Sequence, residues 1–314
     1  MDNIAPQITC PANKNFNVDG SCEFDLANYT SEAIVSDNCT AAGSITVTQA
    51  PAPNTTISGN GTIQTITLTA NDGNGNTTNC TFNITLQDPT KPTITCPANK
   101  SFDVDGSCEF DLGDYTSEAI VADNCTAPAS ITVTQAPAAG TTISGDGTIQ
   151  ITTLTAIDGQ GNNERCTFTI TLNDNTNPTI TCPANQTLSV NAMCAIDLPD
   201  YTSSATVTDN CTADGSISVT QSPTAGTTLM GDGTMQTVTL TANDGNGNTS
   251  QCTFTVTLED NSIPAITCPA NMDVSINNAC NYNIINYTNQ ANVVGVCDPP
   301  SAFTITQTLS LIHI

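Results

Sequence analysis

The segment at residues 80–86, CTFNITL, carries the pattern that decides the fold. Phe82, Ile84 and Leu86 alternate with polar residues, so their side chains share one face of an extended strand. The segments CEFDL (22–26), SITVTQ (44–49) and ITLTA (66–70) alternate in the same way. This period of two, with Thr on the second face, is typical of half-buried antiparallel strands. No stretch has helical periodicity.

Turn sequences separate these predicted strands. They are Asp19-Gly20, Gly59-Asn60-Gly61 and the segment DGNGN at residues 72–76. Glycine and Asn supply the backbone conformations that tight turns need. About seven short strands in roughly 80 residues, with turns every 8–12 residues, predict an all-β immunoglobulin-like sandwich.

The chain is a tandem repeat with a period of 86 residues. Its cysteines lie at positions 10, 22, 39 and 80, then 96, 108, 125 and 166, then 182, 194, 211 and 252, then 268, 280 and 297. Each differs from its counterpart by 86, without insertions, which indicates duplication of one structural unit. We expect tandem sandwiches in a linear rod: repeats at 1–88, 89–174 and 175–260, and a truncated fourth at 261–308.

The composition excludes several classes of partner. The formal net charge is -25, from 29 acidic residues against 4 Lys and Arg. Binding to nucleic acid or to anionic lipid requires a basic surface, so we expect neither. No run of eighteen apolar residues appears, and we expect no membrane span in this segment. Fifteen cysteines indicate a disulfide framework and an extracellular or cell-surface location.

Several motifs recur in a fixed order and carry a family resemblance. They are PTITCPAN (92–99), GSC (106–108), DNC (123–125), the pattern TAxDGxGN and the pattern CTFxITLxD. Together they resemble the hyalin repeat, or HYR domain, over three repeats and the first half of the fourth. The resemblance implies an immunoglobulin-like sandwich of extracellular adhesive proteins, which also occurs in tandem in bacterial surface proteins. The fourth repeat departs from it, because DNC has become Gly295-Val296-Cys297.

Four cysteines in a unit allow three disulfide pairings. In a sandwich of this kind the first and last strands run side by side, which favours Cys10–Cys80, and family members that keep only those two cysteines agree. Cys22–Cys39 then follows by elimination. The predicted set is Cys10–Cys80, Cys22–Cys39, Cys96–Cys166, Cys108–Cys125, Cys182–Cys252, Cys194–Cys211 and Cys280–Cys297, with Cys268 unpaired. Zinc is disfavoured because no His lies nearby and no Cys-x-x-Cys occurs.

Both ends of the sequence have the form of cuts. Acidic linkers join the units, and the opening MDNIAP resembles such a linker with Met1 as an internal start, so we expect a signal peptide upstream. Repeat register holds through Gln307 and then breaks. Residues 309–314 are interpreted as a non-native tail derived from a sequencing adaptor, with the alternative that they are a diverged strand.

The sequence holds no candidate catalytic set. There is no Ser/His/Asp arrangement and no glycine-rich phosphate loop, and every distinctive feature is repeated, whereas an active site is expected once. The single His, His313, lies in the final segment. Tyr residues at 29, 115, 201 and 287 recur at one register position, which favours a structural role over a carbohydrate-binding platform. Lys14 and Lys100 have Gln186 and Met272 as counterparts, which excludes a repeated isopeptide bond.

The carboxylates suggest a metal site, although acidic turn residues are also common without one. In this fold the loops before the third and last strands share the pole where the linker enters, so three acids should gather there in each repeat. Oxygen ligands are those that Ca²⁺ prefers. The predicted calcium sets are Asp2, Asp37 and Asp72; Asp88, Asp123 and Asp158; and Asp174, Asp209 and Asp244.

The sequence therefore predicts a structural or adhesive stalk segment of a larger surface protein, with an unknown surface, matrix or glycan ligand and no obligate oligomer. One alternative is a spacer array in a secreted enzyme whose catalytic domain lies elsewhere. Another is a calcium-dependent adhesin that binds a ligand through loops at one pole.

Overall fold

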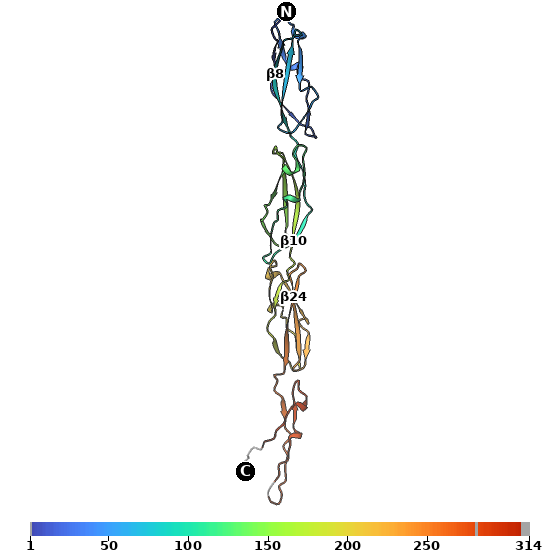
Figure 1. Cartoon of the computed structure of the whole chain (residues 1–314). Helices are drawn as coiled ribbons and strands as arrows, with labels where there is room; N and C mark the ends of the chain where they lie inside the picture. Colours follow the sequence, from blue (N-terminus) through green and yellow to red (C-terminus); the bar gives the residue numbers. More distant parts are fainter. Residues whose placement is uncertain (1, 280–281, 309–314) are drawn as a thin grey trace. The chain divides into compact units, whose positions relative to one another are not determined.

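The computed structural model describes residues 2–279 and 282–308, and over these ranges the protein is built from strands and short 3-10 turns (Figure 1). The first repeat contains β1 (Gln7–Thr9), β2 (Lys14–Asn17), β3 (Glu23–Asp25), η1 (Thr30–Glu32), β4 (Ile34–Ser36), η2 (Ala42–Ser44), β5 (Thr46–Ala50), β6 (Thr56–Ser58), β7 (Ile63–Asn71) and β8 (Thr77–Gln87). None of the helices in the described ranges has the length and hydropathy that a membrane crossing requires.

The strands of the first repeat form a sandwich with immunoglobulin-like topology. One sheet has the order β2-β8-β7-β5, and the pairs β1-β4 and β3-β6 lie outside it. The second strand, β2, runs parallel to the last strand, β8, with Lys14 opposite Ile84, and all other pairings are antiparallel. The parallel neighbour of the last strand is thus the second strand and not the first, while β1 is joined to β8 by the Cys10–Cys80 bond at its end.

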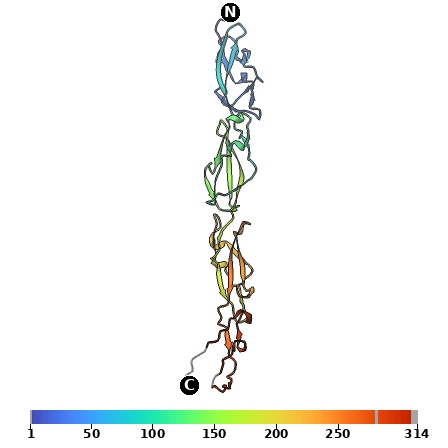
Figure 2. The same ribbon diagram turned by 60° about the horizontal axis from the view of Figure 1, so that its bottom comes forward.

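The next two repeats have the same element order, and their long central strands stand out in the turned view of Figure 2. The second contains β9 (Thr93–Thr95), β10 (Lys100–Asp103), β11 (Glu109–Asp111), η3 (Thr116–Glu118), β12 (Ile120–Ala122), η4 (Pro128–Ser130), β13 (Thr132–Ala136), β14 (Thr142–Ser144), β15 (Ile149–Ile157) and β16 (Asn163–Asn173). The third contains β17 (Thr179–Thr181), β18 (Gln186–Ser189), β19 (Ala195–Asp197), η5 (Thr202–Ser204), β20 (Thr206–Thr208), η6 (Asp214–Ser216), β21 (Ser218–Ser222), β22 (Thr228–Met230), β23 (Met235–Asn243) and β24 (Thr249–Glu259).

The core lies on the apolar face that the sequence pattern predicts. Phe82, Ile84 and Leu86 of β8 are buried, and they pack with Ile66 and Leu68 of β7. The corresponding residues of β24 and β23 form the core of the third repeat. The alternation of apolar and Thr residues therefore fixes which face of each long strand points inward.

The recurring tyrosines belong to this core. Tyr29, Tyr115 and Tyr201 are buried, and the Tyr29 ring meets Phe82 edge to face with ring centroids 5.4 Å apart. A glutamine holds the segment before each of them. The Gln49 amide oxygen accepts from the Tyr29 N–H at 2.8 Å, and its nitrogen donates to the carbonyls of Ala27 and Pro51, both at 3.1 Å. The predicted structural role of these tyrosines is confirmed.

The chain divides into two compact units, and the division does not follow the repeat boundaries. Met1–Asp103 and Glu109–Asn173 form the first unit, while Val104–Cys108 and Asp174–Ile314 form the second. The short segment Val104–Cys108 groups with the second unit because Cys108 is covalently bonded to Cys211.

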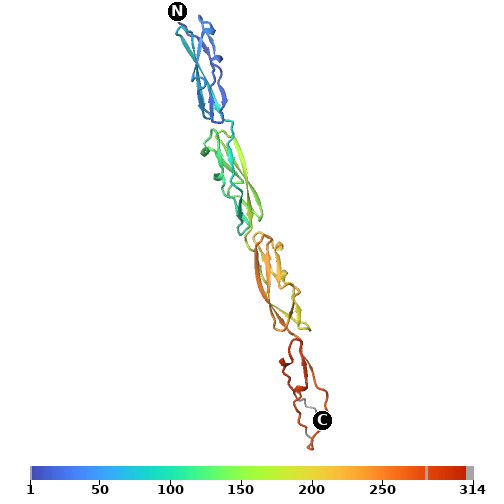
Figure 3. The same cartoon turned by 90° about the vertical axis from the view of Figure 1, so that its right-hand side faces the viewer.

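The fourth repeat has less regular structure, and Figure 3 shows it as mostly irregular chain. Its described elements are β25 (Ala265–Thr267), η7 (Thr288–Gln290), β26 (Asn292–Val294) and η8 (Pro300–Ala302). Apolar residues such as Ile276 and Ile284 are more than half exposed, at 62% and 51%. Residues 309–314, interpreted above as an adaptor-derived tail, lie outside the described residues.

Candidate functional site

The first set of predicted disulfides is present in the structure. Each bond joins the end of the first strand to the last long strand of the same repeat, as Cys10 at the end of β1 joins Cys80 in β8. The bonds are Cys10–Cys80, Cys96–Cys166 and Cys182–Cys252, each with a sequence separation of 70. These three predictions are confirmed.

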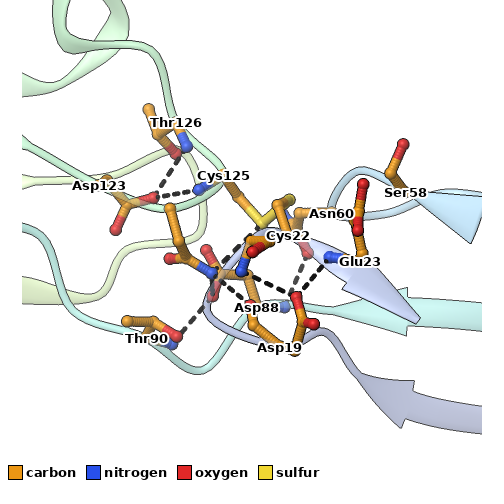
Figure 4. Close-up of a disulfide and its surroundings, with 12 residues drawn as sticks. Asp19, Cys22, Glu23, Ser58, Asn60, Asp88, Thr90, Asp123, Cys125 and Thr126 are labelled. Atoms are coloured by element: carbon orange, nitrogen blue, oxygen red, sulfur yellow. Dashed lines mark hydrogen bonds between the residues drawn. A yellow bond between two sulfur atoms is a disulfide. The ribbon is translucent and has the colours of Figure 1, made fainter. Parts of the chain in front are cut away.

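The second set of predicted disulfides is wrong. Cys22 does not pair with Cys39 inside its repeat but with Cys125 in the next one (Figure 4). The bonds observed are Cys22–Cys125, Cys108–Cys211 and Cys194–Cys297, each with a sequence separation of 103. They replace the predicted Cys108–Cys125, Cys194–Cys211 and Cys280–Cys297, and Cys280 itself lies outside the described residues.

The poles of the sandwich explain this correction. Cys22 lies in the turn before β3, beside the end of β8, where the Val18 N–H donates to the Gln87 carbonyl. Cys39 lies at the opposite pole, where Thr40 Oγ1 donates to the Asp72 carbonyl. The eleven residues of β8 extend roughly 35 Å between the two poles. A disulfide requires Cα atoms within about 7 Å, so a bond inside the repeat is excluded.

The strand topology, and not the local sequence, carried a signal for this pairing. Asp37 was assigned to the pole where the linker enters, and Cys39 follows it by two residues. Cys22 lies in the turn between β2 and β3, at the pole opposite to the one where the linker enters. The linker brings the far pole of one repeat to the near pole of the next, which makes Cys22 and Cys125 neighbours.

Two cysteines in the described part of the chain are free. Cys39 and Cys268 are both exposed. The free state was predicted for Cys268, whereas Cys39 was expected to bond with Cys22.

Three aspartates meet beside the Cys22–Cys125 bond within the first unit, as the sequence predicts. Each of Asp88, Asp123 and Asp158 offers a carboxylate oxygen, and these oxygens all lie within 4.8 Å of one another. Asp88 directly follows β8 of the first repeat. Asp123 and Asp158 follow β12 and β15 of the second repeat, so the cluster connects the two repeats.

Hydrogen bonds fix the loops that present these carboxylates. Asp123 Oδ2 accepts from the N–H groups of Cys125 and Thr126, at 3.0 and 2.8 Å (Figure 4). Asp158 Oδ1 accepts from the N–H of Asn162 at 2.8 Å, and the Asn162 amide nitrogen donates both to Asp158 Oδ2 and to the Asp88 carbonyl. The carboxylates are therefore held in place by short local turns.

Other oxygens in this cluster have no hydrogen-bond partner among the described residues. They are Asp88 Oδ2, Asp123 Oδ1 and Asn124 Oδ1, and all three are inaccessible to solvent. Asp88 is 5% exposed and Asp158 is 6% exposed. Two unit charges within 4.8 Å of each other repel by at least about 3.5 kcal/mol at an effective dielectric constant of about 20. The cluster thus gathers negative charge and leaves acceptor oxygens unused.

The second unit contains the equivalent cluster. Carboxylate oxygens of Asp174, Asp209 and Asp244 also lie within 4.8 Å of one another. Burial raises the pKa of Asp244, but hydrogen bonds from Asn246 and Asn248 outweigh it and hold that pKa below its ordinary value. A second cluster at the same register position shows that the arrangement is a property of the repeat.

The first predicted set, Asp2, Asp37 and Asp72, is not among the metal-competent clusters of the described residues. The Asn76 amide nitrogen still donates to the Asp2 carbonyl and to Asp72 Oδ2. N–H groups of Cys39 and Thr40 lower the pKa of Asp37. The turns are preserved at this end, and the Asp2 side chain lies within hydrogen-bonding reach of the Asp37 carboxylate.

A family comparison matches the third repeat. Residues 173–258 match the model of the HYR domain. Over these residues the chain is similar to the HYR domain. Its match spans one 86-residue period, beginning two residues before the predicted repeat boundary at 175. None of the curated proteins matched the chain.

Among solved structures, the chain is similar to protocadherin gamma B2 extracellular cadherin domains 1-5, with a TM-score of 0.37 and 11% identity, covering 82% of this chain and 60% of that one. It is also similar to mouse cadherin-23 EC22-24, with a TM-score of 0.36 and 13% identity, covering 82% of this chain and 99% of that one. A third similar structure is the I-band fragment I67-I69 from titin, with a TM-score of 0.37 and 11% identity, covering 82% of this chain and 100% of that one.

Proposed function

We propose that this chain is a segment of an extracellular structural or adhesive stalk in a larger surface protein, and that its other repeats are HYR domains like residues 173–258. The single observation that carries the proposal is the bonding of each repeat to the next by a disulfide. Six disulfides among the described residues support an oxidising, extracellular location.

Two covalent connections join each repeat to the next. One is the peptide linker, and the other is the disulfide between repeats, such as Cys22–Cys125. An enzyme or a ligand-binding module has no need of a second covalent connection at every boundary. A chain that transmits tension does, because a second connection keeps neighbouring repeats attached and restricts their rotation.

The disulfides also define short covalent paths along the chain. From Cys10 to Cys96, one path crosses the Cys10–Cys80 bond and then follows 16 residues of backbone. From Cys22 to Cys108, another crosses the Cys22–Cys125 bond and returns along 17 residues. At about 3.5 Å per residue, either path limits one repeat to roughly 60–65 Å even when it is unfolded.

The role that we propose is mechanical and not catalytic. The distinctive features recur along the described chain, with a disulfide between repeats at three boundaries and an acidic cluster at two of them. An active site is expected once in a chain, with its own arrangement of acid, base and nucleophile.

A force-extension measurement on the whole chain, pulled from its two ends, tests the proposal. In oxidising buffer, each complete repeat should extend to no more than roughly 60–65 Å, and after reduction to roughly 300 Å, the contour length of 86 residues. Extension to the longer limit without reduction would contradict a role in bearing tension.

A further inference from the structure

The two aspartate clusters combine convergence, burial and unused acceptor oxygens. Asp88, Asp123 and Asp158 come from one linker and two loops, yet their carboxylate oxygens lie within 4.8 Å of one another. Acidic side chains at the surface usually separate to reduce repulsion. Here local hydrogen bonds to Asp123 and Asp158 hold them together.

The second observation is the buried oxygen of Asp88. This side chain is 5% exposed, and its Oδ2 accepts no hydrogen bond from any described residue. Asn124 Oδ1, beside it, is also buried without a partner, while the Asn124 nitrogen donates to Asp88 Oδ1 at 3.4 Å. Buried polar atoms are nearly always satisfied, so unpaired acceptors beside three carboxylates indicate a missing positive ligand.

No lysine supplies that positive charge among the described residues. Lys91, the nearest in sequence to Asp88, pairs with Glu164 at 3.4 Å. The other ion pairs join Lys14 to Glu32 and Lys100 to Glu118.

We propose that each cluster binds one calcium ion, held by Asp88, Asp123, Asp158 and Asn124 in the first unit and by the register-equivalent residues in the second. Calcium binds six to eight oxygen ligands at 2.3–2.6 Å. Ligands on opposite sides of such an ion are about 4.6–5.2 Å apart, so carboxylate oxygens that all lie within 4.8 Å of one another can contact one ion. Water completes the coordination.

The proposed ion ties the linker to both loops of the following repeat. Asp88 directly follows the last strand of one repeat, and Asp123 precedes the disulfide-bonded Cys125 by two residues. Calcium and the disulfide would thus fasten the same junction. This inference goes beyond the proposed function, because cation binding does not depend on what the chain is attached to.

Isothermal titration of the whole chain with CaCl₂ tests the site. The wild-type chain should bind two ions, one for each cluster, with dissociation constants on the order of 10⁻⁴–10⁻³ M, as in other extracellular modules. Asp123→Asn and Asp209→Asn should each bind one ion, and the double variant none. Asparagine keeps an oxygen that can accept the two backbone N–H groups, so the turn is preserved while the charge is lost.

Two comparisons make the result specific. Asp214→Asn removes one exposed charge from the third repeat, outside the cluster, and should still bind two ions. MgCl₂ should bind about tenfold more weakly, because Mg²⁺ requires a smaller octahedral site. The remaining site in each single variant shows that the chain is folded.

The proposal would be overturned if no calcium heat appeared up to about 10 mM, above the range of extracellular sites. Two ions bound by Asp123→Asn, or magnesium bound as tightly as calcium, would overturn it too. The titration involves no applied force, so its failure is distinct from a failure of the proposed stalk function.

Discussion

The paired covalent paths lead to a prediction about extension under load. In the variant, serine replaces every cysteine that bonds within a repeat. These cysteines are Cys10, Cys80, Cys96, Cys166, Cys182 and Cys252. This removes the path through the Cys10–Cys80 bond and its equivalents, and leaves only the bonds between repeats.

The expected length follows from the pairing seen in the structure. With Cys22–Cys125 and its equivalents intact, one repeat still spans 17 residues and one cystine, or roughly 65 Å when fully extended. If Cys22 were bonded to Cys39 instead, only 17 of the 86 residues would be bypassed. The remaining 69 would then extend to roughly 240 Å.

Single-molecule force spectroscopy measures this contour length directly. The variant should unfold at lower force than the wild-type chain, because each lost bond closes a loop of 70 residues that contributes roughly 4 kcal/mol in the chain-entropy model. Its final contour length should nevertheless remain close to that of the oxidised wild-type chain. Blocking free thiols beforehand prevents bonds between copies, and thiol titration confirms that the bonds between repeats have formed.

A contour length near 240 Å per repeat in the variant would refute the reasoning. It would show that the second cysteine set bonds within repeats, and the mechanical argument for the stalk would lose its basis. A length near 65 Å supports both the pairing and the redundancy of the two paths.

Three further predictions concern single features. Mild acid cleaves the labile Asp88–Pro89 and Asp298–Pro299 bonds, and the two large fragments, about 9 and 22 kDa by their share of the 32.4 kDa chain, should separate on a gel only after reduction, because Cys22 and Cys125 hold them together; separation without reductant would contradict this bond. Gln221→Ala should lower the free energy of unfolding of the third repeat by about 2 kcal/mol, since three backbone groups lose their partner, and an unchanged denaturant midpoint would contradict that role. Burial raises the pKa of Tyr201, so its stabilising contribution is complete below pH 10 and is lost as the pH rises through the folded-state pKa; alkaline unfolding followed by circular dichroism should shift to higher pH in Tyr201→Phe, and an equal midpoint would count against it.

Local pattern was sufficient to predict the sandwich and the faces of its strands. In β8, Phe82, Ile84 and Leu86 are buried as the alternation requires. A strand has a period of two, so the face of each residue follows from its neighbours alone. The convergence of Asp88, Asp123 and Asp158 was predictable for a similar reason, because each residue follows a strand end whose pole is set by the topology.

The glutamine that supports each tyrosine was not found from sequence. Gln49 lies at a position where alternation predicts only a polar residue. Its three hydrogen bonds reach Tyr29 and the carbonyls of Ala27 and Pro51. Contacts of this kind depend on how a loop crosses a strand, which residue periodicity does not describe.

The sequence by itself determined the period of 86 residues, the all-β class and the bonds of the Cys10–Cys80 type. The tertiary structure decided which repeat supplies the partner of Cys22. In a repeat of constant period, Cys39 and Cys125 have the same position in their units, so local sequence cannot distinguish a partner 17 residues away from one 103 residues away. Only the length of β8 separates the two poles and rules out the nearer cysteine.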